Sequence, residues 1–140
     1  MSMLSRRSLL STLLALASIA AAPNRANVAA KSMVVDDVKG WLAGEALLVG
    51  QRYLQLQSAE ASLDVLADLL LERLQSAALS DMQHDFSLAV QEDFERGDVV
   101  NLDGWMLSST EVRLCALAYL AERETAVALV GRSRPRVNLQ

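Results

Sequence analysis

The chain has 140 residues, of which 52% are hydrophobic and 21% charged, and its formal net charge is −4. A chain of this length is expected to form one domain with a modest core, and its acidic balance disfavours nucleic acids and anionic lipid surfaces as partners. Cys115 is the only cysteine, which excludes an internal disulfide.

The first residues have the pattern of an export signal. Arg6 and Arg7 are adjacent, no acidic residue accompanies them, and an apolar run follows at positions 9–22. That run is shorter than the roughly 20 apolar residues that a membrane-spanning helix needs. We therefore interpret residues 1–30 as a signal segment rather than as part of the folded domain.

Cleavage is expected after Ala30, because Val28-Ala29-Ala30 supplies the small residues that processing requires. Pro23 disfavours cleavage directly after Ala22. The chain from Lys31 onward then has ten basic residues, which are the thirteen of the full chain less the three in the signal, against all seventeen acids. Its charge balance of −7 describes a clearly acidic domain.

The N-terminal pattern resembles the twin-arginine signals of bacteria. Ser5, Arg6 and Arg7 match that pattern, and Leu9 stands where many members have Phe. The resemblance implies recognition by the twin-arginine (Tat) translocase and export of an already folded protein to the periplasm. Two alternatives stay open, namely an ordinary secretory signal with a chance arginine pair and an uncleaved N-terminal anchor.

The remaining sequence predicts an all-α fold, a small antiparallel bundle of about four helices over residues 31–131. Helix-forming residues dominate, and no proline occurs between Pro23 and Pro135. The apolar spacing predicts helices at 36–57, 58–78, 80–97 and 109–130. Residues 132–140 are expected to be a flexible basic tail.

Two features of these predicted helices have alternative interpretations. Gly40, Gly44 and Gly50 either bend the first helix or allow another backbone to approach, and bending is the simpler interpretation. The third helix ends in an acidic cluster where the helix dipole disfavours negative charge. This cluster is either solvated or a docking patch for a basic partner, and it comprises Glu92, Asp93, Glu95 and Asp98.

Residues 98–107 are the one stretch without a helical pattern. Asp103-Gly104 is a two-residue hairpin turn signal between two short apolar runs. Because so short a hairpin is marginal alone, we expect the segment to fold over the helices with Trp105 as a plug. Ser108 and Glu111 then have the spacing of a capping box that starts the last helix.

The last helix is apolar on most of its circumference, which predicts a central position or burial against a partner. With the segment before it, this helix supplies the candidate partner interface, consisting of Trp105, Leu107, Leu114, Leu117 and Tyr119.

The sequence offers no catalytic, cofactor-binding or metal-binding residue that we assign. His84 lies near Asp81 and Asp85 but has no other histidine to complete a metal site, so we expect a surface histidine. Cys115 lies in an apolar stretch and is expected to be a small buried hydrophobe. Trp41 is expected in the core.

The signal suggests a function when it is combined with a domain in which we assign no catalytic, cofactor-binding or metal-binding residue. Tat passengers commonly carry a redox cofactor, and the chain resembles the small helical subunits of membrane-associated flavoprotein dehydrogenases in size, signal and helical character. The resemblance implies a non-catalytic periplasmic subunit, without a cofactor of its own, that escorts or stabilises a larger cofactor-bearing redox subunit. It would have no membrane span after cleavage and would reach the inner membrane only through that partner. The alternatives are a stand-alone periplasmic binding or regulatory domain with a groove between helices, and an enzyme acting through His84.

Overall fold

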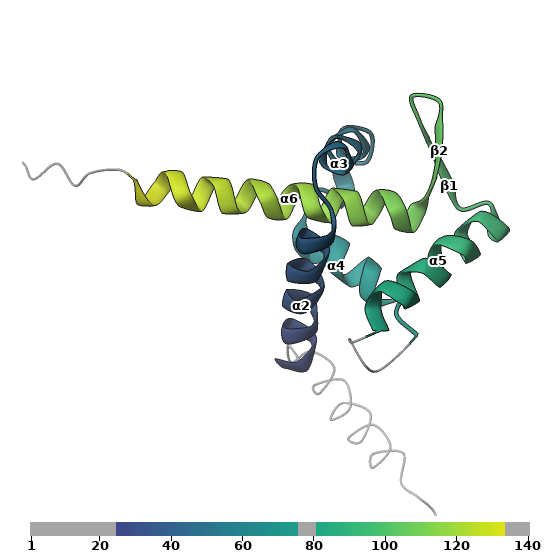
Figure 1. Ribbon diagram of the computed structural model, residues 1–140, viewed down its shortest axis with the longest axis horizontal. Helices are drawn as coiled ribbons and strands as arrows, with labels where there is room; N and C mark the ends of the chain where they lie inside the picture. The colour runs from purple at the N-terminus through teal and green to yellow at the C-terminus, as the bar shows by residue number, and fades with distance from the viewer. Residues whose placement is uncertain (1–24, 76–80, 134–140) are drawn as a thin grey trace, which may run out of the picture.

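The longest helix, α6 (Ser109–Arg132), is the axis of the fold, and the other elements pack around its N-terminal half (Figure 1). The computed structural model describes residues 25–75 and 81–133. Along the chain the remaining elements are α2 (Arg25–Trp41), α3 (Glu45–Leu56), the 3-10 turn η1 (Ser58–Glu60), α4 (Leu63–Leu71), α5 (Met82–Arg96), β1 (Val99–Leu102) and β2 (Trp105–Ser108).

The core lies where α2, α3, α4 and α5 meet the first three turns of α6. Apolar side chains recur at helical spacing on each of these helices, so each buries one face against the centre. The fully buried apolar positions with the largest side chains are Val34, Val38, Leu66, Leu70, Met82, Val112 and Leu117. The C-terminal half of α6 projects beyond this core, and every residue from 122 to 133 is exposed.

The predicted helix at 36–57 is in fact two helices. It breaks between Trp41 and Glu45, where Gly44 adopts a φ of 60° that residues with side chains rarely adopt. The first of the two begins at Arg25, so it extends across the expected cleavage position after Ala30.

Gly50 has a different role from Gly44. The sequence pattern favoured a bend at all three glycines, and for Gly50 that interpretation was wrong. Gly50 is buried in the middle of α3. A Cβ built on it would overlap the carbonyl of Cys115 and the backbone nitrogen of Ala116 on α6. The missing side chain therefore lets the two helix backbones come into direct contact.

The second predicted helix is also shorter than expected. The chain at 58–71 forms η1 and then α4, with Leu66 and Leu70 of the predicted apolar stripe fully buried. Ser80, the predicted cap of the third helix, lies outside the described residues. That helix, α5, ends as predicted at Gly97, whose φ of 76° is the left-handed conformation of a helix C-cap.

The two-residue turn at Asp103-Gly104 was predicted correctly, and the position of Trp105 was not. β1 and β2 pair antiparallel with Leu102 opposite Trp105, and both turn residues have positive φ. Trp105, however, is 75% exposed and plugs nothing. The hairpin stands beside the start of α6, and its turn extends away from that helix (Figure 1).

The fold is mostly helical, as predicted, with this small hairpin added. The predicted antiparallel bundle differs from the observed arrangement, because α2 crosses α6 instead of running alongside it (Figure 1).

We expect Gly50→Ala to lower the free energy of unfolding by about 2 kcal/mol or more, because the added methyl group forces α3 away from α6. Gly40→Ala is the matched control. Gly40 is helical and exposed, with nothing within 4 Å of the added Cβ, so its substitution should stabilise the protein by about 0.5–1 kcal/mol. Urea unfolding followed by circular dichroism measures both, and equal effects of the two variants would contradict the close contact.

Candidate interaction surface

The tip of the hairpin presents two large apolar side chains to solvent. Trp105 is 75% exposed and Met106 is 54% exposed. Arg52 on α3 braces the turn, because its Nε and Nη2 donate to the two carboxylate oxygens of Asp103 at 3.1 Å each. These hydrogen bonds lower the pKa of Asp103. A two-point ion pair thus ties the turn that carries the apolar tip to α3.

The five residues of the predicted interface lie in different environments. Leu117 is fully buried in the core and has no surface to offer a partner. Leu107, Leu114 and Tyr119 are partly buried and pack against the core. Only Trp105 is largely exposed. Met106 was missed, although it adjoins Trp105 directly after the turn signal.

The start of α6 is fixed by two separate acidic side chains. Ser108 Oγ accepts from the Glu111 backbone N–H at 2.9 Å, while Glu111 Oε2 accepts from the Ser108 N–H at 2.8 Å, which is the predicted capping box. Asp93 Oδ2 also accepts from the Thr110 N–H at 2.7 Å. Negative charge is favourable at a helix N-terminus, so both carboxylates stabilise α6 and fix the strand that leads into it.

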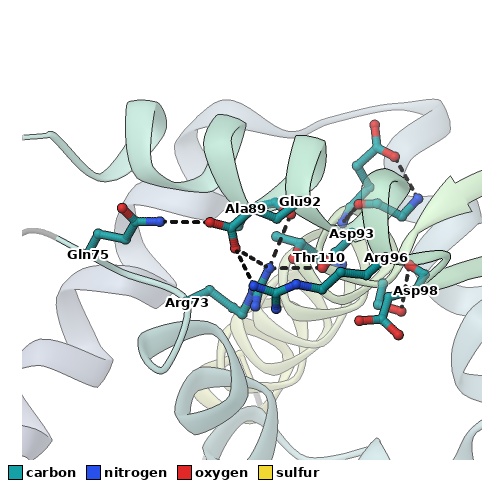
Figure 2. Close-up of polar contacts among 11 residues, drawn as sticks. Arg73, Gln75, Ala89, Glu92, Asp93, Arg96, Asp98 and Thr110 are labelled. Carbon is teal, nitrogen blue, oxygen red and sulfur yellow. Dashed lines mark hydrogen bonds and ion pairs between the residues drawn. The ribbon is translucent and has the colours of Figure 1, made fainter.

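The same Asp93 belongs to an ion-pair cluster between α4 and α5 (Figure 2). Arg73 Nη2 lies 2.9 Å from Asp93 Oδ1 and 3.3 Å from Glu92 Oε2, and it donates to the Ala89 carbonyl at 3.2 Å. Glu92 also pairs with Arg96 and accepts from the Gln75 side chain. Asp93 is 3% exposed.

This cluster corrects both interpretations of the acidic run for one of its members, Asp93. Asp93 is neither solvated nor available to a basic partner, because it turns inward between Arg73 and the first turn of α6. Asp98 contributes its backbone carbonyl to Ser109. Glu95 and the Asp98 side chain remain on the surface.

A second cluster ties the turn after α3 to α6. Arg113 donates from Nε and Nη2 to the two oxygens of Glu60, at 3.1 and 3.0 Å, and the Tyr53 hydroxyl donates to Glu60 at 2.7 Å. The hydrogen bonds from Arg113 lower the pKa of Glu60, and burial together with Glu60 raises the pKa of Tyr53 to about 12. Glu60 therefore stays charged and Tyr53 stays protonated at neutral pH.

The residues considered for chemistry do not come together. His84 is exposed, whereas its neighbour Asp85 is buried and accepts from the Gln75 backbone N–H. Within residues 25–75 and 81–133 no three His, Cys, Asp or Glu side chains are placed to hold a metal ion. Cys115 is partly buried, and burial raises the pKa of its thiol to about 11, which leaves it protonated and unreactive at neutral pH.

Trp41 adopts an intermediate position between core and surface. It is 37% exposed, and its ring packs edge-on against Phe86 of α5 with the ring centres 6.4 Å apart.

Among the helices that the structure describes, none combines the length and hydropathy that crossing a membrane requires.

A groove of about 860 Å³ runs along the projecting half of α6, where that helix leaves α2 and α4. Its α6 wall is a stripe at helical spacing, formed by Leu120, Arg123, Glu124, Val127 and Ala128. Lys31 and Asp64 lie on the opposite wall, joined by an ion pair of 2.7 Å that Lys31 extends to Asp68. No local sequence pattern locates this groove, because its walls come from three separate helices.

Comparison with known proteins adds no relative: no protein-family model, curated protein or solved structure matches this chain.

We expect Asp93→Ala to lower the free energy of unfolding by about 3 kcal/mol, because Arg73 and the Thr110 N–H both lose their closest acceptor. Glu95→Ala, which removes an exposed acid from the same helix, should change it by no more than about 0.5 kcal/mol. Chemical denaturation of both variants measures the difference, and similar losses would argue against the buried cluster.

The Glu60 cluster predicts a stability that depends on pH. A carboxyl group whose pKa is lowered by folding stabilises the protein above its unfolded pKa of about 4.3, and the stabilisation is lost as the pH falls through the folded value. Glu60→Gln should therefore be less stable than the wild type at pH 7, and the gap should close below about pH 4.

The control for this pH experiment is Glu122→Gln, which changes an exposed acid on α6. It should match the wild type at every pH. A gap for Glu60→Gln that is constant from pH 7 to about pH 3 would show that packing, and not charge, causes the loss.

Proposed function

We propose that this protein is a non-catalytic accessory subunit of an oxidoreductase exported through the twin-arginine pathway. In this proposal Arg6 and Arg7 direct the chain to the Tat translocase, and the folded domain acts in the periplasm. It binds a larger cofactor-bearing redox subunit and needs no cofactor of its own. The observation that carries the proposal is the exposed apolar tip of the hairpin, Trp105 and Met106.

The hairpin tip has the character of a protein-binding anchor. Tryptophan and methionine are enriched in protein interfaces, and tryptophan is prominent among the residues that contribute most to binding. The turn that presents them is braced by Arg52 and Asp103, so little conformational entropy would be lost on binding. A large apolar side chain held rigidly in water is unfavourable for an isolated domain, and burial by a partner removes that cost.

The burial pattern of α2 is compatible with removal of the signal. Residues 25–29 are exposed, and the first buried side chain of the helix is Val34. Among the described residues, cleavage after Ala30 would therefore remove no buried side chain. Lys31 would become the first residue, and its ammonium group would still hold α2 to Asp64 and Asp68 on α4.

The alternative, a stand-alone binding domain, would use the groove between α2, α4 and α6. Sites for small apolar ligands are usually deep and largely apolar, and they enclose most of the ligand surface. This groove is open along α6 and has Lys31, Asp64, Arg123 and Glu124 on its walls. Its shape and charge favour a macromolecular segment over a small apolar ligand, so we place the accessory-subunit function first.

We expect Trp105→Ala/Met106→Ala to fold normally but to lose its partner. The tagged full chain, expressed in its own host and recovered from the periplasm, should co-purify with a subunit that shows flavin, haem or molybdenum absorbance. The double variant should recover at least about tenfold less of that subunit, because interface anchors typically contribute 2 kcal/mol or more. Leu48→Ala, another exposed apolar residue, is the matched control on α3.

Replacing Arg6 and Arg7 by lysine tests the export half of the proposal, and the variant should stay in the cytoplasm. A periplasmic wild type that co-purifies with no redox subunit would refute the accessory role. Undiminished export of the lysine variant would favour an ordinary secretory signal.

A further inference from the structure

The projecting half of α6 carries exposed apolar surface that the core does not explain. Five consecutive apolar residues occupy positions 126–130, so this part of the helix has no polar face. Val127 is 71% exposed and Val130 is 70% exposed. A helix that is apolar all round is normally buried.

One face of this projecting segment forms a wall of the groove already described. Glu124 and Ala128 lie in the groove wall, and Arg132 follows at the same spacing of four residues. These three positions form one i±4 row along the helix surface, with a small residue between opposite charges. Such a row is complementary to itself when a second copy runs antiparallel, because each Glu124 then lies opposite the other copy's Arg132.

The other charged side chains around the groove do not compete for Glu124 or Arg132. Lys31 is occupied by Asp64 and Asp68, and Arg123 lies over the Tyr119 ring with 5.6 Å between its Cζ atom and the ring centre. Within the described parts of the chain, neither Glu124 nor Arg132 makes an ion pair.

We propose that the groove is occupied by the C-terminal half of α6 from a second copy of this chain. The two helices pack antiparallel about a two-fold axis at Ala128, with two symmetry-related Glu124–Arg132 pairs. Val127 is buried between the helices, and the small side chain of Ala128 lets the two backbones approach. The interface is isologous, so it closes at a dimer and leaves no open end for further chains.

The length of the projection fits this arrangement. Residues 122–132 are the exposed part of α6, and an axis at position 128 lies near their middle. The tip of one copy therefore reaches the point where the other copy's α6 enters its core. There Arg132 meets Glu124, with the exposed carboxylate of Asp64 on the facing wall of the groove.

Symmetric cross-linking tests the proposal on the full chain in its own cells. In a Cys115→Ala background, Ala128→Cys places a thiol on the axis in each copy, and a short bifunctional maleimide should join the two into a covalent dimer. Glu122→Cys is the control. Its two copies would be twelve residues apart along the helix pair, roughly 18 Å, and should cross-link poorly.

Two sets of substitutions test which face makes the contact. Val127→Asp should reduce the cross-linked fraction about tenfold or more, because dimerisation would bury an unpaired carboxylate. Leu129→Asp changes a similarly exposed residue, at 60%, on the opposite side of the helix and should leave cross-linking unchanged. Glu124→Arg and Arg132→Glu should each weaken the dimer, and combining the two should restore it.

Three results would overturn the proposal. They are a chain that stays monomeric in the presence of the cross-linker, equal effects of Val127→Asp and Leu129→Asp, and capture of a different protein by Ala128→Cys in place of the second copy. All of these variants leave Trp105 and Met106 unchanged, so failure of the dimer is distinguishable from failure of the accessory function.

Discussion

The contact between the backbones of α3 and α6 at Gly50 is the constraint on which much of the structure depends. Because Gly50 has no side chain, α3 lies directly against Cys115 and Ala116. That position of α3 brings Arg52 to the hairpin turn and brings Tyr53 to the carboxylate that also binds Arg113. A single small residue in the middle of a helix thus determines whether the hairpin is braced and whether the turn after α3 is anchored.

Ion pairs join the peripheral elements to this centre. Lys31, Arg52, Arg73 and Arg113 each bind acids on a different element, and their partners lie 19 to 53 residues away in the sequence. The exposed pairs contribute little to stability individually, whereas the pairs that include buried Asp93 or half-buried Glu60 are shielded from solvent. In this acidic chain with few aromatic residues, several of the basic side chains therefore help to fix how the short helices are arranged around α6.

The features predicted correctly from the sequence are those determined by neighbouring residues. The capping box of Ser108 and Glu111, the Asp103-Gly104 turn and the helix end at Gly97 each depend on a few adjacent positions. The errors involve contacts between distant segments. Gly44 and Gly50 are both glycines in the same predicted helix. Only tertiary packing determines that the helix breaks at Gly44 and that another backbone approaches at Gly50. Asp93 turns inward because Arg73, in the turn after α4, pairs with its carboxylate. Trp105 faces solvent because no element that the structure describes packs over the outer face of the hairpin.

Helix α6 shows why apolar content alone could not separate core from interface. Its first half and its last two turns are similarly apolar, but only the first half is enclosed by other helices. The hairpin precedes the helix and the groove lies along its far half, so the two exposed apolar surfaces are separated by the folded core (Figure 1). A partner bound at Trp105 and a second copy bound at Val127 would not compete for the same surface. Because both surfaces are attached to one continuous helix, pairing of two copies would also fix the spacing between two bound partners.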